Sequence, residues 1–322
     1  MPLNPELLTP PEQNIAAEMA YGLGRAALAD TNADDPYADL VESYAQDPKD
    51  ALAVARESLL AIGSDRTLTS TEKDAQLDKG LSAFFDLTVK LDHAAFPATK
   101  PGEIEEGVPD YIPDGFVDMG KHRSTKPYER IEPGDSSPRE QILVDKRAIL
   151  EKYKPFLKDL MGRDFSQLDL QTKKRRLATE TAKEIYRSMQ FNLAASENLG
   201  GGLVNLSTVP EGVCRHQGLT FQVLCQTLGL KSRLLKSYRD GERHSTNLLR
   251  IDEQWYIFDV TNPDYKRTPG GNEWRPGAYK IDEPPVPNER KKYHVTGKFS
   301  GDDHTYVAHD NMYWRILSPE EF

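Results

Sequence analysis

Three residues in the second half of the chain have the types and the order that nucleophilic thiol chemistry needs. They are Cys214, His244 and Asp259, separated by intervals of 30 and 15 residues. In such chemistry a thiol attacks a carbonyl carbon, an imidazole takes the thiol proton, and a carboxylate orients the imidazole and stabilises its charged form. The sequence therefore predicts an enzyme that forms a covalent intermediate on a cysteine.

Cys214 begins an apolar helical pattern that continues to Leu228. On a helix, Cys214, Gly218, Phe221, Cys225 and Leu228 lie on one face, which we expect to be buried with Cys214 at its exposed N-terminal tip. The free amide N–H groups and the positive end of the helix dipole would lower the thiol pKa there and could bind an oxyanion. Cys225, among apolar residues, is expected to be a buried structural cysteine.

Two strand-like runs carry His244 and Asp259, and Asp252 and Glu253 join them. A two-residue turn at this point, or a four-residue loop around it, pairs residues whose numbers sum to 505. Asp259 then lies opposite Thr246 and diagonal to His244 on the same face, at about 7–8 Å between α-carbons. A three-residue turn would place the two side chains on opposite faces, so the predicted triad depends on this register.

Other residues compete for parts of this site. His216 follows Cys214 by two residues, or 200° around a helix, so its ring is expected to point away from the thiol. Either Asn205 or Gln190 could donate a side-chain hydrogen bond to the oxyanion, and their spacing does not distinguish them. Three histidines near acidic residues could bind a metal, although such residues in a loop-rich segment are usually exposed polar side chains: His294, His304 and His309.

The stretch 212–263 resembles the core of the transglutaminase-like superfamily, whose members share a papain-like Cys-His-Asp arrangement. The matching features are a Cys-led helix that ends at Leu228-Gly229-Leu230, a strand led by His244, and a Trp-containing strand that ends in Asp259-Val260-Thr261. The segment Gly212–His216 is also similar to the domain that precedes the kinase in some plant Raf-like kinases. The resemblance covers roughly 55 of the 322 residues.

This resemblance implies an α+β fold with a papain-like or transglutaminase-like core, in which the nucleophile helix packs on an antiparallel sheet. It implies acyl transfer through a thioester on Cys214, with His244 and Asp259 as the other catalytic residues. The substrate is expected to be a protein or peptide, and the favoured reaction is transamidation or deamidation of protein glutamine. A cysteine peptidase on the same triad and a non-catalytic papain-like binding module remain as alternatives. None of these needs a cofactor or a metal ion.

The family often has Ala-Trp after the catalytic His, where this chain has Ser245-Thr246. The family's preferences among acyl acceptors are therefore not carried over to this chain.

Composition narrows the possible partners. The formal net charge of −10 argues against a nucleic-acid partner and against an anionic membrane surface. Two cysteines exclude a disulfide framework and a Cys-rich zinc site. On one helix Cys214 and Cys225 would be about 16 Å apart, too far for a disulfide with each other. The sequence does not indicate an oligomeric state.

The first 30 residues lack a positively charged segment followed by an apolar core. The segment Ile15–Ala29 contains Glu18 and Arg25 and is too short to span a bilayer. We therefore expect a soluble protein without a transmembrane segment, either cytoplasmic or delivered without a Sec-type signal peptide.

Patterning predicts three regions: a helical region 1–96, a Pro-rich linker or wrapping segment 97–136, and a catalytic core 137–322. Four helices are predicted in the first region: Pro11–Ala29, Pro36–Tyr44, Lys49–Ile62 and Ser70–His93. In the core, the residues Ser137-Pro138-Arg139-Glu140 predict the start of a helix that carries Ile142 and Leu143. A second helix is predicted over Leu170–Asn192, and short strands follow Pro263.

Overall fold

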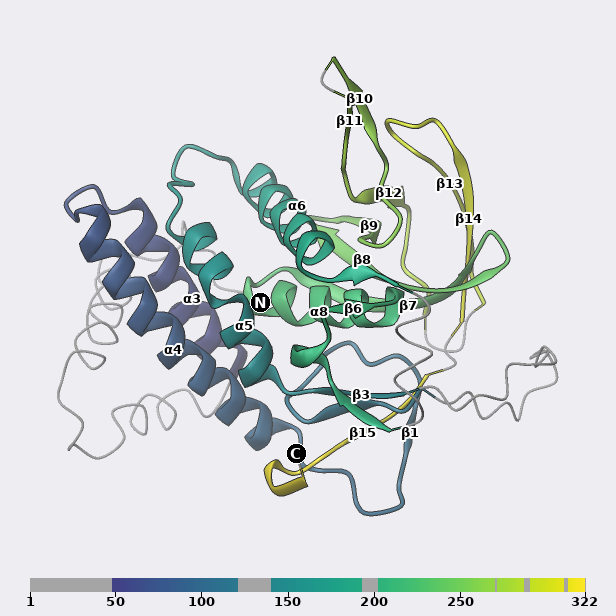
Figure 1. Cartoon of the computed structure of the whole chain (residues 1–322), viewed down its shortest axis with the longest axis horizontal. Helices are drawn as coiled ribbons and strands as arrows, with labels where there is room; N and C mark the ends of the chain where they lie inside the picture. Colours follow the sequence, from purple (N-terminus) through teal and green to yellow (C-terminus); the bar gives the residue numbers. More distant parts are fainter. Residues whose placement is uncertain are drawn as a thin grey trace. The chain divides into compact units, whose positions relative to one another are not determined.

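A computed structural model describes residues 48–120, 140–192, 202–269, 271–286, 290–309 and 312–321 (Figure 1). The chain divides into two compact units, one with the helices before residue 97 together with Leu150–Asp169, the other with Pro97–Ile149 and Leu170–Phe322. Helices and several sheets occur together, so the fold is α+β, as predicted. The predicted helices Pro11–Ala29 and Pro36–Tyr44 lie outside the described residues.

The first unit contains α3 (Pro48–Ser64), α4 (Ser70–Ala95) and the greater part of α5 (Lys146–Met161). Thr69 caps α4: its hydroxyl accepts the Glu72 N–H at 3.3 Å, and the Glu72 carboxylate accepts the Thr69 N–H at 2.8 Å. The apolar stripe of α4 is buried: Leu77, Leu81, Phe84, Phe85 and Leu91. The two predicted helices that fall in the described part of this region are confirmed within two residues at each end.

A six-stranded antiparallel sheet dominates the second unit, with the order β12-β9-β8-β7-β14-β13. Its strands are β7 (Lys231–Arg239), β8 (Glu242–Ile251), β9 (Gln254–Asp259), β12 (Gly277–Ile281), β13 (Lys292–Thr296) and β14 (Asp303–Ala308). The edge strands β12 and β13 contact each other, so the sheet curls on itself. All six strands contribute to one buried cluster inside the curl, which includes Leu235, Leu248, Ile257, Tyr279, Tyr293 and Tyr306.

The β8–β9 hairpin has the predicted register. Ile251 pairs with Gln254 and Asn247 with Phe258, so the turn contains two residues and paired numbers sum to 505. The first turn residue, Asp252, has φ = 54°, the left-handed conformation that two-residue hairpin turns require. His244 and Asp259 therefore project toward the same side of the sheet.

The helix α8 (Cys214–Thr227) packs on β7 and β8, with α6 (Leu170–Ser188) against it (Figure 1). Polar side chains tie the helix to the sheet: the Asn247 amide donates to the Gly218 carbonyl at 3.1 Å, and the Gln222 amide to the Ser232 carbonyl at 2.6 Å. Cys225 is fully buried at this interface, as predicted. The arrangement of a helix on an antiparallel sheet positions the N-terminus of α8 beside β8.

A second sheet has the order β1-β15-β2-β3-β5. Its strands are β1 (Glu105–Glu106), β15 (Tyr313–Ile316), β2 (Phe116–Asp118), β3 (Gln141–Val144) and β5 (Leu203–Asn205). The predicted linker or wrapping segment thus contributes two strands. Smaller elements are the parallel pair β4 (Gln190–Phe191) and β6 (Glu211–Gly212), the hairpin β10 (Lys266–Thr268) and β11 (Gly271–Glu273), and the 3₁₀ turns Leu206–Thr208 and Pro319–Glu321.

The predicted helix does not begin at Ser137. Ile142 and Leu143 lie on β3, and α5 begins only at Lys146. Asp145 begins the helix instead, because its carboxylate accepts the Ala148 N–H at 2.8 Å. The apolar run before it pairs with β2 and β5, which are distant in the sequence.

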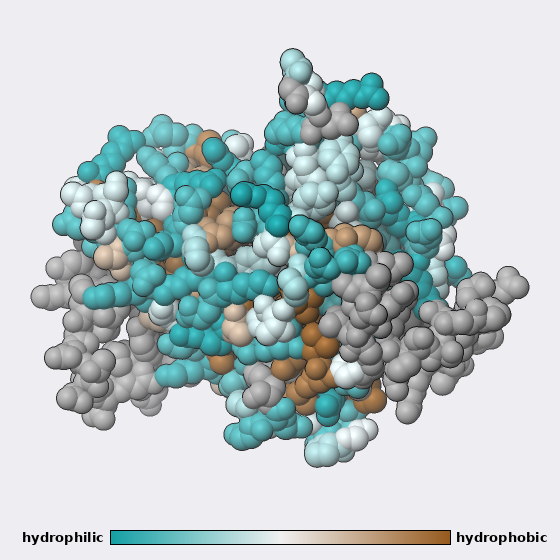
Figure 2. Space-filling model, viewed as in Figure 1, coloured by the Kyte–Doolittle hydropathy of each residue, from teal (hydrophilic) through white to brown (hydrophobic). Residues whose placement is uncertain are grey.

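The boundaries of the two compact units also differ from those of the predicted regions, because residues 150–169 belong to the same unit as the N-terminal helices. Whether 1–96, 97–136 and 137–322 behave as separate parts stays a prediction. None of the described helices is long and apolar enough to span a membrane. The face shown in Figure 2 is mostly hydrophilic, as expected for a chain with 29% charged residues.

Candidate active site

Cys214 is the first residue of α8, and the residue is half-buried. The chain enters the helix from β6 through Val213, whose backbone is extended, and the first helical hydrogen bonds return to the Val213 carbonyl. The backbone N–H of Ser245 donates to the thiol, which places Cys214 against β8. Cys214 therefore lies at the N-terminus of a helix, as predicted.

His244 lies between Cys214 and Asp259. Its Nε2 is 2.8 Å from Asp259 Oδ2, and a second hydrogen bond joins the imidazole to the Cys214 thiol. Because Nε2 is used by Asp259, Nδ1 is the ring nitrogen left for the thiol. The structure thus brings the three sequence-predicted residues into one hydrogen-bonded chain.

Asp259 is fully buried, and its carboxylate has several donors besides His244. Oδ1 accepts the backbone N–H groups of Thr261 at 3.1 Å and Asn262 at 3.0 Å. Oδ2 accepts the Tyr306 hydroxyl at 2.8 Å. Asp259 therefore ends β9, caps the following turn and orients His244 at the same time.

The pKa values follow from these contacts. Burial alone would raise the pKa of the Cys214 thiol, but the hydrogen bond and charge of His244 outweigh it and lower that pKa below its usual range. Burial would likewise lower the pKa of His244, whereas Asp259 and then Cys214 raise it to about 10. Burial raises the pKa of Cys225 well above its usual range. The site therefore favours a thiolate–imidazolium pair at neutral pH.

His216 supports the entry into α8 and does not contact the thiol. Its Nδ1 accepts the Val213 N–H at 3.2 Å, and burial, aided by the charge of Arg215, lowers the pKa of the ring to about 3, so it is neutral. The ring packs so closely on Gly212 that a Cβ at that position would be 2.8 Å from His216 Cβ. His216 thus fixes the backbone from which Cys214 projects.

A buried group of charges adjoins the site, and sequence reasoning missed it. Asp118 Oδ2 is 3.2 Å from Lys236 Nζ and 3.6 Å from Arg215 Nε, and Arg215 also donates to the Glu140 carbonyl at 2.8 Å. The two cations hold the pKa of Asp118 well below its usual range despite its burial. Lys236 also contributes to the lowered pKa of Cys214. The sequence did not single out Lys236, because its strand β7 also contains Lys231, Arg233 and Arg239.

The structure separates the two candidate oxyanion donors. The Asn205 side chain accepts from Ser207 N and donates to Asp145 Oδ2 at 3.1 Å, so its amide is already used in a turn. Gln190 lies exposed on β4, which pairs with β6 immediately before Cys214. Gln190 is therefore the candidate whose side chain is exposed and whose strand pairs with the segment that leads into Cys214.

The carboxy-terminal histidines have other contacts. His304 Nδ1 lies 3.0 Å from Asp240 Oδ2, and His294 Nδ1 lies 3.2 Å from the Thr305 hydroxyl. Within the described ranges, no three His, Cys, Asp or Glu side chains are grouped so that they could hold a metal ion.

Comparison with known proteins gives two matches. Residues 164–264 match the sequence model of a family described as EDR1/CTR1/ARMC3, peptidase-like. The chain is also 31% identical over 84 residues to a probable serine/threonine-protein kinase, SIS8, of Arabidopsis thaliana. The aligned residues make up 25% of this chain and 8% of the kinase. The chain thus spans less than a tenth of the length of this curated relative. Both matches support the predicted similarity to a peptidase-like domain found with plant Raf-like kinases, and the matched range contains Cys214, His244 and Asp259.

Proposed function

We propose that Cys214, His244 and Asp259 form a catalytic triad for acyl transfer through a thioester, and that the acyl donor is a glutamine side chain of a protein. The observation that carries this proposal is the continuous hydrogen-bonded chain from the thiol through His244 to the buried carboxylate. The lowered pKa of Cys214 beside the raised pKa of His244 supports it. The packing of α8 on an antiparallel sheet supports a papain-like or transglutaminase-like core.

In the proposed reaction the Cys214 thiolate attacks the carbon of the glutamine carboxamide. The N–H groups of the first turn of α8 face the developing oxyanion, and the Gln190 amide is the candidate side-chain donor. The His244 imidazolium gives its proton to the leaving nitrogen, so ammonia departs and a thioester remains. An amine or a water molecule then gives up a proton to His244 and attacks the thioester, which releases the new amide or glutamate and restores the thiolate–imidazolium pair.

A cysteine peptidase is the second candidate, because the family matched by residues 164–264 is described as peptidase-like. The two candidates share the triad and the thioester, and they differ in the leaving group and in which acceptor reaches the thioester. A non-catalytic papain-like binding module is the third candidate, and it predicts no turnover at all.

One experiment separates the three. The full chain is incubated with a dansylated amine and a glutamine-rich acceptor protein, and in parallel with fluorogenic peptides. Amine incorporation or glutamate formation supports the first candidate, and peptide cleavage alone supports the second. Cys214→Ala should abolish either activity, whereas Cys225→Ala is the matched control at the other, buried cysteine. Turnover that survives Cys214→Ala would exclude the triad as the catalyst.

Asp259→Asn tests the role of the carboxylate. An asparagine Oδ1 can still accept the Thr261 and Asn262 N–H groups, so the turn and the fold should persist. Turnover should fall by orders of magnitude, by analogy with the roughly 10⁴-fold loss in a serine triad, because the wrong tautomer of His244 is then favoured. If the turnover of Asp259→Asn is unchanged, Asp259 only caps the turn and has no role in catalysis.

A further inference from the structure

Gln217 is a fully buried polar residue of α8, three positions after Cys214, and the reaction described above does not use it. Residues three apart on a helix are neighbours on its surface, so the Gln217 side chain lies on the side of α8 that carries the thiol. Its amide nitrogen donates to the Met189 carbonyl at 2.8 Å, and its amide oxygen accepts the Thr261 hydroxyl at 2.8 Å. Gln217 therefore joins α8 to two segments that are distant from it in the sequence.

The two partners fix the orientation of this amide. A backbone carbonyl can only accept a hydrogen bond, so the nitrogen of Gln217 must face Met189. The oxygen then faces Thr261, whose hydroxyl is the donor. Met189 directly follows α6, and the last carbonyls of a helix have no partner within it, so Gln217 supplies one. The nitrogen thus serves the end of α6, and the oxygen serves the turn after β9.

Thr261 connects Gln217 to the candidate triad. Its backbone N–H donates to Asp259 Oδ1 at 3.1 Å, while its hydroxyl donates to Gln217. These contacts close a ring, which runs from Cys214 along one turn of α8 to Gln217, through Thr261 to Asp259, and through His244 back to the thiol. A displacement that lengthens one contact of a closed ring must strain another.

This ring bears on the chemistry because the reacting groups lie on different elements. The thiol is on a helix, and the imidazole and the carboxylate are on two strands of the sheet. Their separation therefore depends on how the helix and the end of β9 are held together. Catalysis is sensitive to that separation, since a displacement of about 1 Å can reduce a rate by about 100-fold.

We propose that Gln217 and Thr261 are positioning residues, which hold the Asp259–His244 pair within hydrogen-bonding distance of Cys214. The Thr261 hydroxyl is the group that does this, and the Gln217 oxygen is its anchor on α8. Both residues act through Asp259. The use of this geometry in acyl transfer rests on the proposed function, whereas its effect on the thiol does not.

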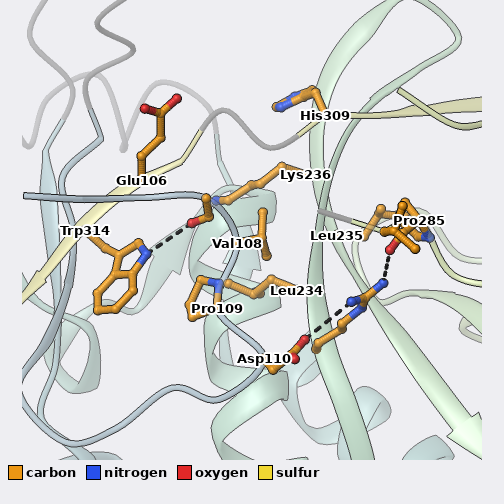
Figure 3. A pocket seen from close by; sticks show the side chains of 13 residues that line it. Glu106, Val108, Pro109, Asp110, Leu234, Leu235, Lys236, Pro285, His309 and Trp314 are labelled. Carbon is orange, nitrogen blue, oxygen red and sulfur yellow. Dashed lines mark hydrogen bonds and ion pairs between the residues drawn. The ribbon is translucent and has the colours of Figure 1, made fainter. Parts of the chain in front are cut away.

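A cavity beside β7 provides a place for a control substitution. It has a volume of about 440 Å³, and Val108, Lys236 and Trp314 are among the residues that line it (Figure 3). The ring residues Gln217 and Thr261 do not line it. Val108→Ala therefore removes packing within the same compact unit but leaves the ring in place.

The test measures the rate at which iodoacetamide alkylates Cys214 in the full chain as a function of pH. Its midpoint reports the thiol pKa and requires no turnover. Thr261→Val keeps the shape of the side chain but removes the hydroxyl, so the midpoint should move upward, toward the ordinary thiol value of about 8.5. At a pH below both midpoints, labelling should slow about tenfold for each pKa unit of the shift. Thr261→Ser keeps the hydroxyl and should keep the midpoint of the unchanged chain. If Thr261→Val and Thr261→Ser have the same midpoint, the proposal is overturned.

Two controls separate positioning from a general loss of stability. Thr227→Val makes the same chemical change at the other end of α8, where the hydroxyl donates to the Val223 carbonyl at 2.9 Å. Thr227→Val and Val108→Ala should make the chain unfold at lower urea concentrations but should leave the alkylation midpoint unchanged. If the alkylation midpoint follows stability in all of these variants, the ring has a structural role alone, which also overturns the proposal.

The double variant Gln217→Met/Thr261→Val tests whether the two residues act through their shared hydrogen bond. Each single change breaks that bond, so the double variant should shift the midpoint no further than the larger of the two single shifts. Additive shifts would show independent effects and would contradict the proposal. Gln217→Met also removes the donor to the Met189 carbonyl, and if it fails to fold, the comparison of Thr261→Val with Thr261→Ser decides the outcome.

Turnover separates this proposal from the proposed function. If the full chain is active, Thr261→Val should lower kcat by about 10- to 100-fold and leave KM unchanged, because the ring acts on the geometry of the triad. If the alkylation midpoints shift as expected but no acyl transfer or cleavage is found, the positioning role stands and the catalytic proposal fails. If turnover is found and the midpoints coincide, the reverse holds.

Discussion

The two cysteines of the chain lie on one helix but in different chemical surroundings. Cys214 is partly exposed, and His244 lowers its pKa, whereas Cys225 is fully buried and its pKa is raised. The thiolate is the reactive form, so iodoacetamide at neutral pH should label Cys214 faster than Cys225, by roughly a factor of ten or more. Mass spectrometry of the peptides at early times measures both rates. Equal rates would contradict the ion pair at Cys214.

The charge state of His244 gives the site a predictable response to pH. Since its pKa is raised to about 10, the imidazolium persists through neutral pH and is lost only as the pH passes that value, so turnover should decline above about pH 10. His244→Ala removes the largest influence that lowers the thiol pKa, so the pKa of Cys214 should rise. Alkylation rates of Cys214 measured against pH should show the midpoint move upward. A midpoint that moves downward or stays would contradict the pairing.

At the scale of elements, the turn that leads into α8 leaves little room for a methyl group at Gly212. At Gly212 a Cβ would lie 2.8 Å from His216 Cβ, and His216 holds the Val213 N–H. Gly212→Ala should therefore cost about 1–3 kcal/mol of stability through overpacking and should also slow the labelling of Cys214.

Gly218→Ala is the control on the same helix. A Cβ there has its nearest neighbours at 3.6 Å, an ordinary contact, so alanine should be neutral or stabilise by up to about 1 kcal/mol. Urea unfolding measures both variants. The contact argument is contradicted if the two substitutions change the free energy of unfolding equally.

The elements that carry the site were predictable because their signals are local. The helix from Cys214 and the hairpin register through Asp252 follow from periodicity and turn length over about 50 residues. The strand β3 was mistaken for helix, because its partners β2 and β5 come from segments that no local pattern connects to it. The contact of Asp118 with Lys236 joins residues more than 100 positions apart, so residue types alone did not reveal it.

At the scale of the whole molecule, the position of β2 bears on where the chain can be shortened. This strand lies between β15 and β3, and Asp118 at its end is the carboxylate partner of both Lys236 and Arg215. A shortened chain of residues 137–322 lacks β2 and would leave two buried cations without that partner, a loss that typically costs about 3–5 kcal/mol. We therefore expect this shortened chain to be insoluble or unfolded, which would place the predicted boundary at 137 in the wrong position.

Asp118→Asn in the full chain isolates the electrostatic part of that loss. It keeps β2 and removes only the charge, so unfolding by urea should show a destabilisation of about 3–5 kcal/mol. A soluble, folded 137–322 fragment together with an unaffected Asp118→Asn variant would show that this group of charges is dispensable.

The placement of both cysteines on α8 has a consequence for oxidation. A thiolate such as that favoured at Cys214 is the form that peroxide converts to a sulfenic acid, and a nearby second thiol normally rescues that product as a disulfide. Here the second thiol is Cys225, eleven residues along the same helix, about 16 Å away and fully buried. Because Cys225 is too far away to form that disulfide, a thiol from another molecule has to restore an oxidised Cys214, and further peroxide oxidises an unrescued sulfenic acid to the irreversible sulfinic acid.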